Sequence, residues 1–265
     1  MSNYKNKYLK IKITTTVSYI IMIAVNFLAN SIPINGVKTS EVSDAYKNLF
    51  TPAGFTFSIW GIIYLLLALH LLYEFEFLKK FSEKVNIRLV NKVALPFSIS
   101  SIANAGWIIS WHYNYIGVSV VFMIVILISL YYINKEISKR NLNSKQKFFI
   151  RIPFGIYFGW ITVATIANIT VFLVSIGWSG FGISDVIWTN LVLIIGTIIG
   201  SLVLLKFRNI EYGLVLIWSY FGIYVRHTSS SGFYSEYQGI IYTVLFCIAL
   251  LIFNIIYILL KSKNN

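Results

Sequence analysis

Aromatic and amide side chains recur at helical spacing in three apolar segments of the sequence. They are Trp60 and Tyr64 in the first segment, Ser100, Asn104, Trp107 and Trp111 in the second, and Trp160, Ala164 and Asn168 in the third. Residues with such spacing project from one face of a helix. Indoles and amides bind ligands noncovalently, and no catalytic dyad or nucleophile motif accompanies them. The pattern therefore predicts a ligand-binding cup inside a helix bundle.

A structural role explains the same residues without a ligand. Asparagines in spanning helices hydrogen-bond to neighbouring helices, which contributes about 0.6 kcal/mol each. Tryptophans collect in belts at the two membrane surfaces, and Trp178 and Trp188 fit such a belt. Trp60, Trp107 and Trp160 lie deeper than a belt requires. Both interpretations stay open at the level of the sequence.

The segments that carry these residues are predicted to be transmembrane helices. Hydrophobic residues make up 57% of the 265 residues, charged residues 12%, and the mean hydropathy is +0.74. A soluble domain carries about 25% charged residues, and a spanning helix needs about 20 mostly apolar residues. We therefore predict an all-α polytopic bundle of about eight spans rather than a barrel, whose strands would alternate. The spans are residues 13–30, 54–74, 94–112, 115–134, 151–176, 184–205, 212–226 and 238–260.

Positive charge is concentrated in alternate loops. The formal net charge is +13. Most Lys and Arg residues lie near the N-terminus, in residues 77–93 and 135–151, at Lys206 and Arg208, and near the C-terminus. Cytoplasmic loops collect Lys and Arg, so both termini are predicted to be cytoplasmic and residues 31–52 to lie outside the plasma membrane. The membrane accounts for the charge, and no nucleic acid partner is predicted.

Histidine, cysteine and acidic residues form no pattern typical of a metal site. Cys247 is the single cysteine, and His70, His112 and His227 are far apart in the sequence. His70 is predicted to face another helix, although an intramembrane ionisable group also raises the question of a proton relay. Glu74 is predicted to lie near the cytoplasmic boundary, so nothing indicates ion coupling. We therefore predict no metal, no required cofactor and no catalytic residue.

Counting along the predicted helices places three of the polar and aromatic residues at one depth. At about 1.5 Å per residue, Trp60, Asn104 and Asn168 each lie about 10–12 Å below the outer surface. Amides do not face lipid readily, so the asparagines should point into the bundle. The cup is therefore predicted in the outer half of the bundle.

Three segments resemble the tryptophan-rich sensory protein family (TspO, the bacterial relatives of the translocator protein). Residues 51–64, TPAGFTFSIWGIIY, look like the proline-containing start of its second helix and the aromatic segment that follows. Residues 104–107, NAGW, resemble the N-x-x-W of its third helix, and residues 160–168, WITVATIAN, resemble its fifth-helix pattern. The three motifs occur in the family's order and on the corresponding predicted helices.

The chain also departs from the family pattern. Ala53 stands where the family usually has a second proline. The family core has five helices, whereas residues 177–265 are predicted to add about three. We therefore predict a TspO-like five-helix transmembrane core over residues 1–176 and a C-terminal extension over residues 177–265.

The resemblance implies a membrane sensor or regulator that binds a planar hydrophobic ligand, a tetrapyrrole (porphyrin) or a sterol-like molecule, in an aromatic intramembrane pocket. Carried over position by position, the ligand-binding residues are Trp60, Tyr64, Asn104, Trp107, Trp160, Ala164 and Asn168. A tetrapyrrole would be a ligand rather than a required cofactor. The porphyrin-degrading activity proposed for the family has no catalytic motif behind it here.

Other functions and partners remain open at this stage. A secondary transporter or permease component for a small hydrophobic solute is the alternative function. The resemblance implies a homodimer, and Gly155-x3-Gly159 and Gly196-x3-Gly200 have the spacing that lets helices approach closely; the same glycines equally suit packing within one chain. The preference for Lys over Arg is consistent with an AT-rich bacterial genome.

Overall fold

The computed structural model of the protein describes residues 2–75 and 87–263, and the described residues form helices and connecting loops without a strand. The long helices are α1 Ser2–Ser31, α3 Ile59–Glu74, α4 Ile87–His112, α5 Ile116–Ser138, α7 Ile152–Ser175, α8 Asp185–Phe207, α9 Ile210–Thr228 and α10 Gln238–Lys263. Short elements are η1 Ile34–Gly36, α2 Thr39–Ala45, η2 Gly54–Ser58, α6 Ser144–Gln146, the π-helical turn η3 Lys147–Arg151, and η4 Gly180–Gly182. The predicted all-α class is confirmed. Lys79, Lys80 and Lys84 of the predicted basic segment lie outside the described residues.

Seven helical segments among the described residues are long and apolar enough to cross a membrane. They are Tyr8–Ser31, Gly54–Glu74, Ile87–His112, Ile116–Ser138, Ser144–Ser175, Asp185–Phe207 and Gln238–Lys261. The protein is therefore a polytopic helical membrane protein, as predicted. The remaining predicted span, residues 212–226, forms helix α9. This helix is more polar than the seven candidate spans and is not among them. It carries Glu211 and Arg226 near its ends and buries Ser219 and Tyr220 among its apolar residues.

The chain folds into two compact units that are interleaved in the sequence. Unit 1 comprises residues 1–39 and 60–158, and unit 2 comprises residues 40–59 and 159–265. One boundary falls at the start of α3 and the other falls inside α7. The boundaries of these units differ from the predicted domain boundary at residue 176. That predicted division into a core and an extension stays a prediction.

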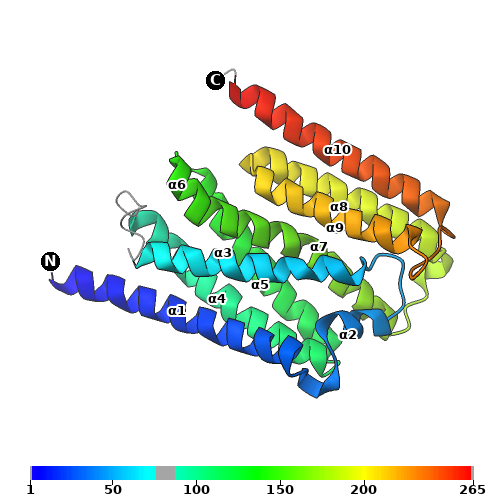
Figure 1. The fold of residues 1–265 in the computed structure, drawn as a ribbon, viewed down its shortest axis with the longest axis horizontal. Coiled ribbons are helices and arrows are strands. Elements are labelled where there is room, and N and C mark those ends of the chain that lie inside the picture. Colours follow the sequence, from blue (N-terminus) through cyan, green and yellow to red (C-terminus); the bar gives the residue numbers. More distant parts are fainter. Residues whose placement is uncertain (1, 76–86, 264–265) are drawn as a thin grey trace. The chain divides into compact units, whose positions relative to one another are not determined.

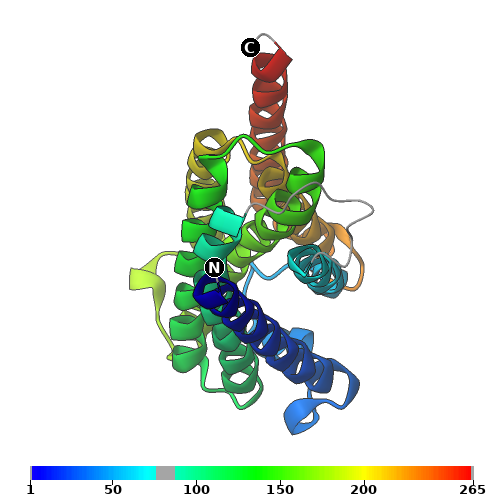
Figure 2. The same cartoon turned by 90° about the vertical axis from the view of Figure 1, so that its left-hand side faces the viewer.

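In unit 1, helix α4 packs against both α1 and α5 (Figure 2). Gly106 allows the close approach to α5, because a Cβ atom at this position would lie 2.7 Å from the Phe122 ring. An ion pair also links α4 and α5, with Lys92 Nζ 2.7 Å from Glu136 Oε2, and Lys139 contacts the other oxygen of the same carboxylate. The close contact at Gly106 and the ion pair of Lys92 with Glu136 thus hold α4 and α5 together at two positions along the helices.

In unit 2, helix α10 lies beside α8 and α9 (Figure 1). A Cβ atom at Gly196 would lie 2.8 Å from the Tyr220 hydroxyl oxygen, and one at Gly200 would lie 2.5 Å from Leu216 Cδ1. Gly159 similarly faces α9, where its Cβ would lie 2.8 Å from the Tyr212 carbonyl oxygen. These three glycines therefore serve packing within the chain. A homodimer stays a prediction.

The predicted outer loop is divided between the two units. In unit 1, Trp111 Nε1 donates to the Thr39 carbonyl oxygen over 3.0 Å. In unit 2, residues 40–59 dock on α9: the Ala53 amide donates to the Gly222 carbonyl (3.0 Å), and Trp218 Nε1 donates to the Thr56 carbonyl (3.1 Å). Backbone polar groups of this irregular segment thus form hydrogen bonds with a helix that is distant in the sequence.

Candidate functional site

Five aromatic residues of unit 1 form a continuous series of ring contacts, which we call the unit 1 aromatic cluster: Trp60, Tyr64, Trp107, Trp111 and Tyr157. The Trp60 ring lies at its centre, stacked on Tyr64 with centroids 5.4 Å apart. It lies 5.7 Å from Trp107 and 5.9 Å from Tyr157. Helix α3 thus brings Trp60 and Tyr64 against Trp107 of α4 and Tyr157 of α7.

The cluster is packed on one side and accessible on the other. Trp107 and Trp111 are each 4% exposed, whereas Trp60 and Tyr64 are half-buried. The Tyr64 hydroxyl is nevertheless shielded from solvent and has no hydrogen-bond partner among the described residues. A buried hydroxyl without a partner costs about 1–3 kcal/mol. A ligand that supplied a polar atom to Tyr64 would recover part of this cost.

Amide side chains beside the cluster are satisfied by the protein itself. Asn26 Nδ2 donates to Asn104 Oδ1 over 2.7 Å, and Asn104 Nδ2 donates to the Tyr157 hydroxyl oxygen over 3.2 Å. All three residues are buried. For Asn104 this geometry favours the role of joining helices over that of a ligand contact. Sequence reasoning missed Tyr157, whose only signal was its position one helical turn before Trp160.

The remaining predicted ligand-binding residues, Trp160, Ala164 and Asn168, belong to unit 2. The Trp160 ring is buried and meets Phe57 edge-to-face, with centroids 5.7 Å apart. Asn168 is also buried, and Ala164 is half-buried. The predicted set is therefore divided, with four residues in unit 1 and three in unit 2. Their joint action on one ligand stays a prediction.

Unit 2 contains a cavity of about 170 Å³, which we call the unit 2 cavity. It is lined by Lys47, Asn48, Leu49, Phe50, Thr170, Leu173, Val174, Trp178, Gly180, Asp185, Trp188, Thr189 and Val192. Trp178 and Trp188 lie with centroids 5.1 Å apart, and Trp188 Nε1 donates to the Gly180 carbonyl over 2.8 Å. The sequence predicts a membrane belt position for both tryptophans, which stays a prediction, and the structure adds that both line this cavity. Its volume is close to that of a cavity that holds a single benzene, about 150 Å³.

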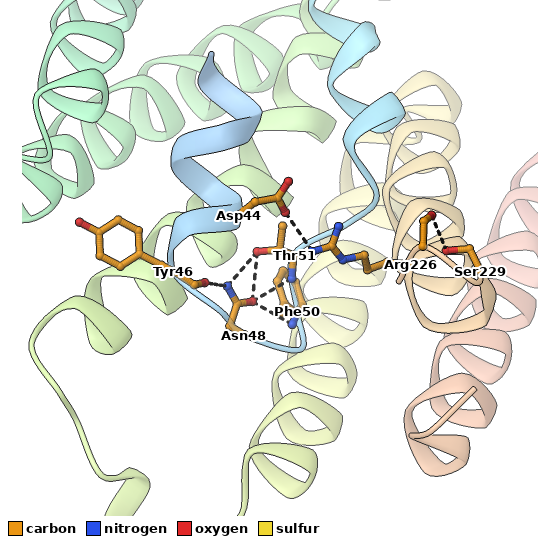
Figure 3. A network of polar contacts seen from close by, with 8 residues as sticks. Asp44, Tyr46, Asn48, Phe50, Thr51, Arg226 and Ser229 are labelled. Atoms are coloured by element: carbon orange, nitrogen blue, oxygen red, sulfur yellow. Dashed lines mark hydrogen bonds and ion pairs between the residues drawn. The ribbon is translucent and has the colours of Figure 1, made fainter. Parts of the chain in front are cut away.

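A second cavity of unit 2, of about 250 Å³, is lined by Ser43, Asp44, Tyr46, Lys47, Asn48, Thr51, Arg226 and Phe233. Figure 3 shows the network beside it, in which Arg226 Nη2 lies 3.0 Å from Asp44 Oδ1. Asn48 Oδ1 accepts from the backbone amides of Phe50 (3.0 Å) and Thr51 (2.9 Å), which closes a local turn. Asn48 lines both cavities. The turn therefore borders both cavities.

One ionisable pair lies fully buried in unit 1. His70 and Glu74 are each 0% exposed, and Nε2 of His70 lies 3.1 Å from Oε1 of Glu74. The sequence predicts that Glu74 lies near the cytoplasmic boundary, which stays a prediction, and the structure adds that its side chain is buried beside His70. In the part of the chain that the structure describes, no three His, Cys, Asp or Glu residues gather as metal ligands.

Comparison with known proteins gives one match. The family model described as TSPO-like protein matches residues 12–257. No curated protein and no solved structure matches the chain. The matched segment includes both units and extends well into α10, so it also covers most of the three helices that follow α7.

Proposed function

Because the chain belongs to the TSPO-like protein family, we propose that it is a membrane sensor or regulator that binds a planar hydrophobic ligand at the unit 1 aromatic cluster. Family membership supports the broader sensing or binding function. The ligand class that we propose is a tetrapyrrole such as a porphyrin, or a sterol-like molecule. The single observation that carries the proposal is the half-buried Trp60–Tyr64 stack backed by Trp107.

The chemistry of the cluster suits a flat apolar molecule. Aromatic rings with offset or tilted partners contribute about 0.5–1.5 kcal/mol beyond the area that they bury. The exposed parts of Trp60 and Tyr64 offer this surface, and the Tyr64 hydroxyl offers one polar group. Trp160, Ala164 and Asn168 are proposed as further contributors, each to be tested by its own substitution.

The test is a titration of the purified protein with protoporphyrin, followed by tryptophan quenching and by porphyrin absorbance. Trp60→Ala and Trp107→Ala should weaken binding about tenfold or more, since tenfold corresponds to about 1.4 kcal/mol. Trp107→Phe keeps an aromatic ring in the buried position and distinguishes lost binding from lost folding. Phe246→Ala, at an exposed position of α10, is the matched control. Equal binding by all variants would refute the proposed site.

A secondary transporter or permease component is a second candidate function. The observation that favours it is the buried His70–Glu74 pair, since intramembrane ionisable residues often mark ion or proton pathways. Uptake of a labelled hydrophobic solute into proteoliposomes, with and without a pH gradient, tests this function. Porphyrin binding without any solute flux would count against it.

We also propose the predicted topology, with both termini in the cytoplasm of a bacterial cell. It rests on the distribution of Lys and Arg between alternate loops. Reporter fusions at the C-terminus and at Lys38 should report opposite sides of the membrane. The same side for both would contradict the topology.

A further inference from the structure

The unit 2 cavity has no part in the ligand site proposed above, and its aromatic wall is held in place by the protein itself. The cavity lies between the end of α7 and the start of α8, and residues 47–50 also line it. The Trp188 indole is fixed by its hydrogen bond to the Gly180 carbonyl. The Trp178 ring contacts both Trp188, at 5.1 Å, and Phe181, at 5.4 Å between centroids. Two indole rings are thus oriented before any ligand binds.

The loop segment that lines the cavity is fixed as well. Asn48 Nδ2 donates to the Tyr46 carbonyl oxygen (2.8 Å) and to Thr51 Oγ1 (2.9 Å), so its amide is used within the loop (Figure 3). The Leu49 carbonyl oxygen lies 2.9 Å from Nε2 of the buried His227. A ligand that enters a cavity with such walls does not have to order a loop, which removes one cost of binding.

The greater part of the lining is apolar. Leu49, Phe50, Leu173, Val174 and Val192 line the cavity together with the two tryptophans. Its volume of about 170 Å³ suits one aromatic ring with a few further atoms, since about 150 Å³ holds benzene. Indole rings bind a second aromatic ring in tilted or offset arrangements. The apolar part of a fitting ligand is therefore a single aromatic ring.

One charge of each sign also borders the cavity. Lys47 and Asp185 line it, both are exposed, and neither forms an ion pair with another of the described residues. Asp44, which lines the second cavity together with Lys47, is instead paired with Arg226. A cavity bordered by one unpaired cation and one unpaired anion is complementary to a ligand that carries both charges.

We propose that the unit 2 cavity binds a one-ring aromatic amino acid such as phenylalanine. The ring lies against Trp178 and Trp188, the carboxylate pairs with Lys47, and the ammonium group pairs with Asp185. Both charged groups of the ligand stay at the exposed border, so neither has to be buried without a partner. A ligand with an amine alone would leave Lys47 unpaired, and a ligand with a carboxylate alone would leave Asp185 unpaired.

The first test compares three probes that differ only in their charged groups. They are 4-fluorophenylalanine, 4-fluorophenethylamine and 3-(4-fluorophenyl)propanoate, titrated by fluorine NMR onto the intact protein in nanodiscs of zwitterionic lipid. The amino acid should bind about two- to fivefold more tightly than either analogue, which is the contribution of one exposed ion pair. An analogue that binds as tightly as the amino acid would overturn the proposal.

Charge-neutral substitutions then test each ion pair. Asp185→Asn should weaken the amino acid and the amine about two- to fivefold and leave the propanoate unchanged. Lys47→Gln should weaken the amino acid and the propanoate by a similar factor and leave the amine unchanged. The unaffected probe is the internal control for folding in each variant. Equal effects of either substitution on all three probes would contradict the assigned pairs.

A cavity-filling substitution tests the location of the ring. Val192→Phe places a ring inside a cavity that holds about one, so it should weaken all three probes about tenfold or more. Ile194→Phe, at an exposed position of the same helix outside the lining, is the matched control and should bind as wild type does. Melting temperatures verify that both variants are folded.

Two results of this last test overturn the site. One is that the wild type binds none of the probes, and the other is that folded Val192→Phe binds them as wild type does. All of these titrations are made without porphyrin, and the proposal does not rest on the unit 1 aromatic cluster. The amino acid site and the proposed function therefore fail separately.

Discussion

Two tryptophan pairs, one in each unit, have different surroundings. Trp60 and Trp107 belong to a packed cluster in which ring faces meet and the neighbouring amides hydrogen-bond to each other. Trp178 and Trp188 line a cavity, with one indole hydrogen-bonded to a backbone carbonyl. The spacing of tryptophans along a helix does not distinguish these cases. The packing of neighbouring segments decides whether an indole fills a core or borders a cavity.

The size of each region also separates the ligands that suit it. The unit 2 cavity, at about 170 Å³, accommodates a group of about one ring. A tetrapyrrole has four rings, so this cavity cannot enclose it. The half-buried faces of the unit 1 aromatic cluster impose no such enclosed volume. This difference favours unit 1 over the unit 2 cavity as the proposed site of the large planar ligand.

The largest effect should come from deleting the buried indole of the cluster. Trp107→Ala is expected to destabilise the protein by about 3–5 kcal/mol, because it leaves a large cavity in a close-packed region. Trp178→Ala, at a half-buried position in a cavity wall, should cost clearly less. Thermal unfolding in detergent compares the two variants. Equal losses of stability would contradict the distinction between Trp107 in a packed core and Trp178 in a cavity wall.

The next effect tests the loop that borders the unit 2 cavity. A Cβ atom at Gly222 would lie 2.1 Å from Thr56 Oγ1, and Thr56 is completely buried. Gly222→Ala should therefore cost about 1–3 kcal/mol in the free energy of unfolding. Gly61→Ala is the matched control, since nothing lies within 4 Å of its Cβ position. A Gly222→Ala variant as stable as wild type would show that residues 40–59 do not dock on α9 as described.

A smaller effect is expected for the unit 2 amide of the predicted ligand set. Asn168→Ala should weaken a porphyrin that has free carboxyl groups by several-fold, because one hydrogen bond contributes about 0.5–1.5 kcal/mol. The corresponding methyl ester should be affected less. In both titrations Trp178→Ala and Trp188→Ala should bind as wild type does. If these two variants lost as much affinity as Trp60→Ala, the ligand would belong to unit 2.

The smallest expected effect is a pH dependence at the end of α9. His227 is buried, Nε2 lies 2.9 Å from the Leu49 carbonyl oxygen, and burial lowers the pKa of His227. Because the folded state resists protonation more than the unfolded chain, stability should fall as the pH decreases below about 6.5. His227→Gln retains a donor for Leu49 and should be less sensitive to pH over this range. Melting temperatures measured from pH 7.5 to pH 5.5 compare the two proteins, and identical profiles would contradict the prediction.

Several properties of the protein follow from the sequence alone. Lipid cannot hydrogen-bond the backbone, so apolar runs of sufficient length must form helices whatever their neighbours are. The all-α membrane class and seven of the eight predicted spans follow from this rule. The family resemblance follows from three short motifs, and the family match over residues 12–257 confirms it. The helix faces that carry Trp60 with Tyr64, and Asn104 with Trp107, follow from helical periodicity.

Tertiary structure decided which faces meet, because burial depends on segments that are distant in the chain. Glu74 ends an apolar helix, and the sequence alone does not show that its side chain is completely buried beside His70, whose ring contacts Phe97 of α4 and Phe154 of α7. The sequence also does not show that residues 47–50 line a cavity together with Trp178 and Trp188. No local periodicity encodes these contacts. They arise only when the helices pack, and they determine which side chains of each site are accessible.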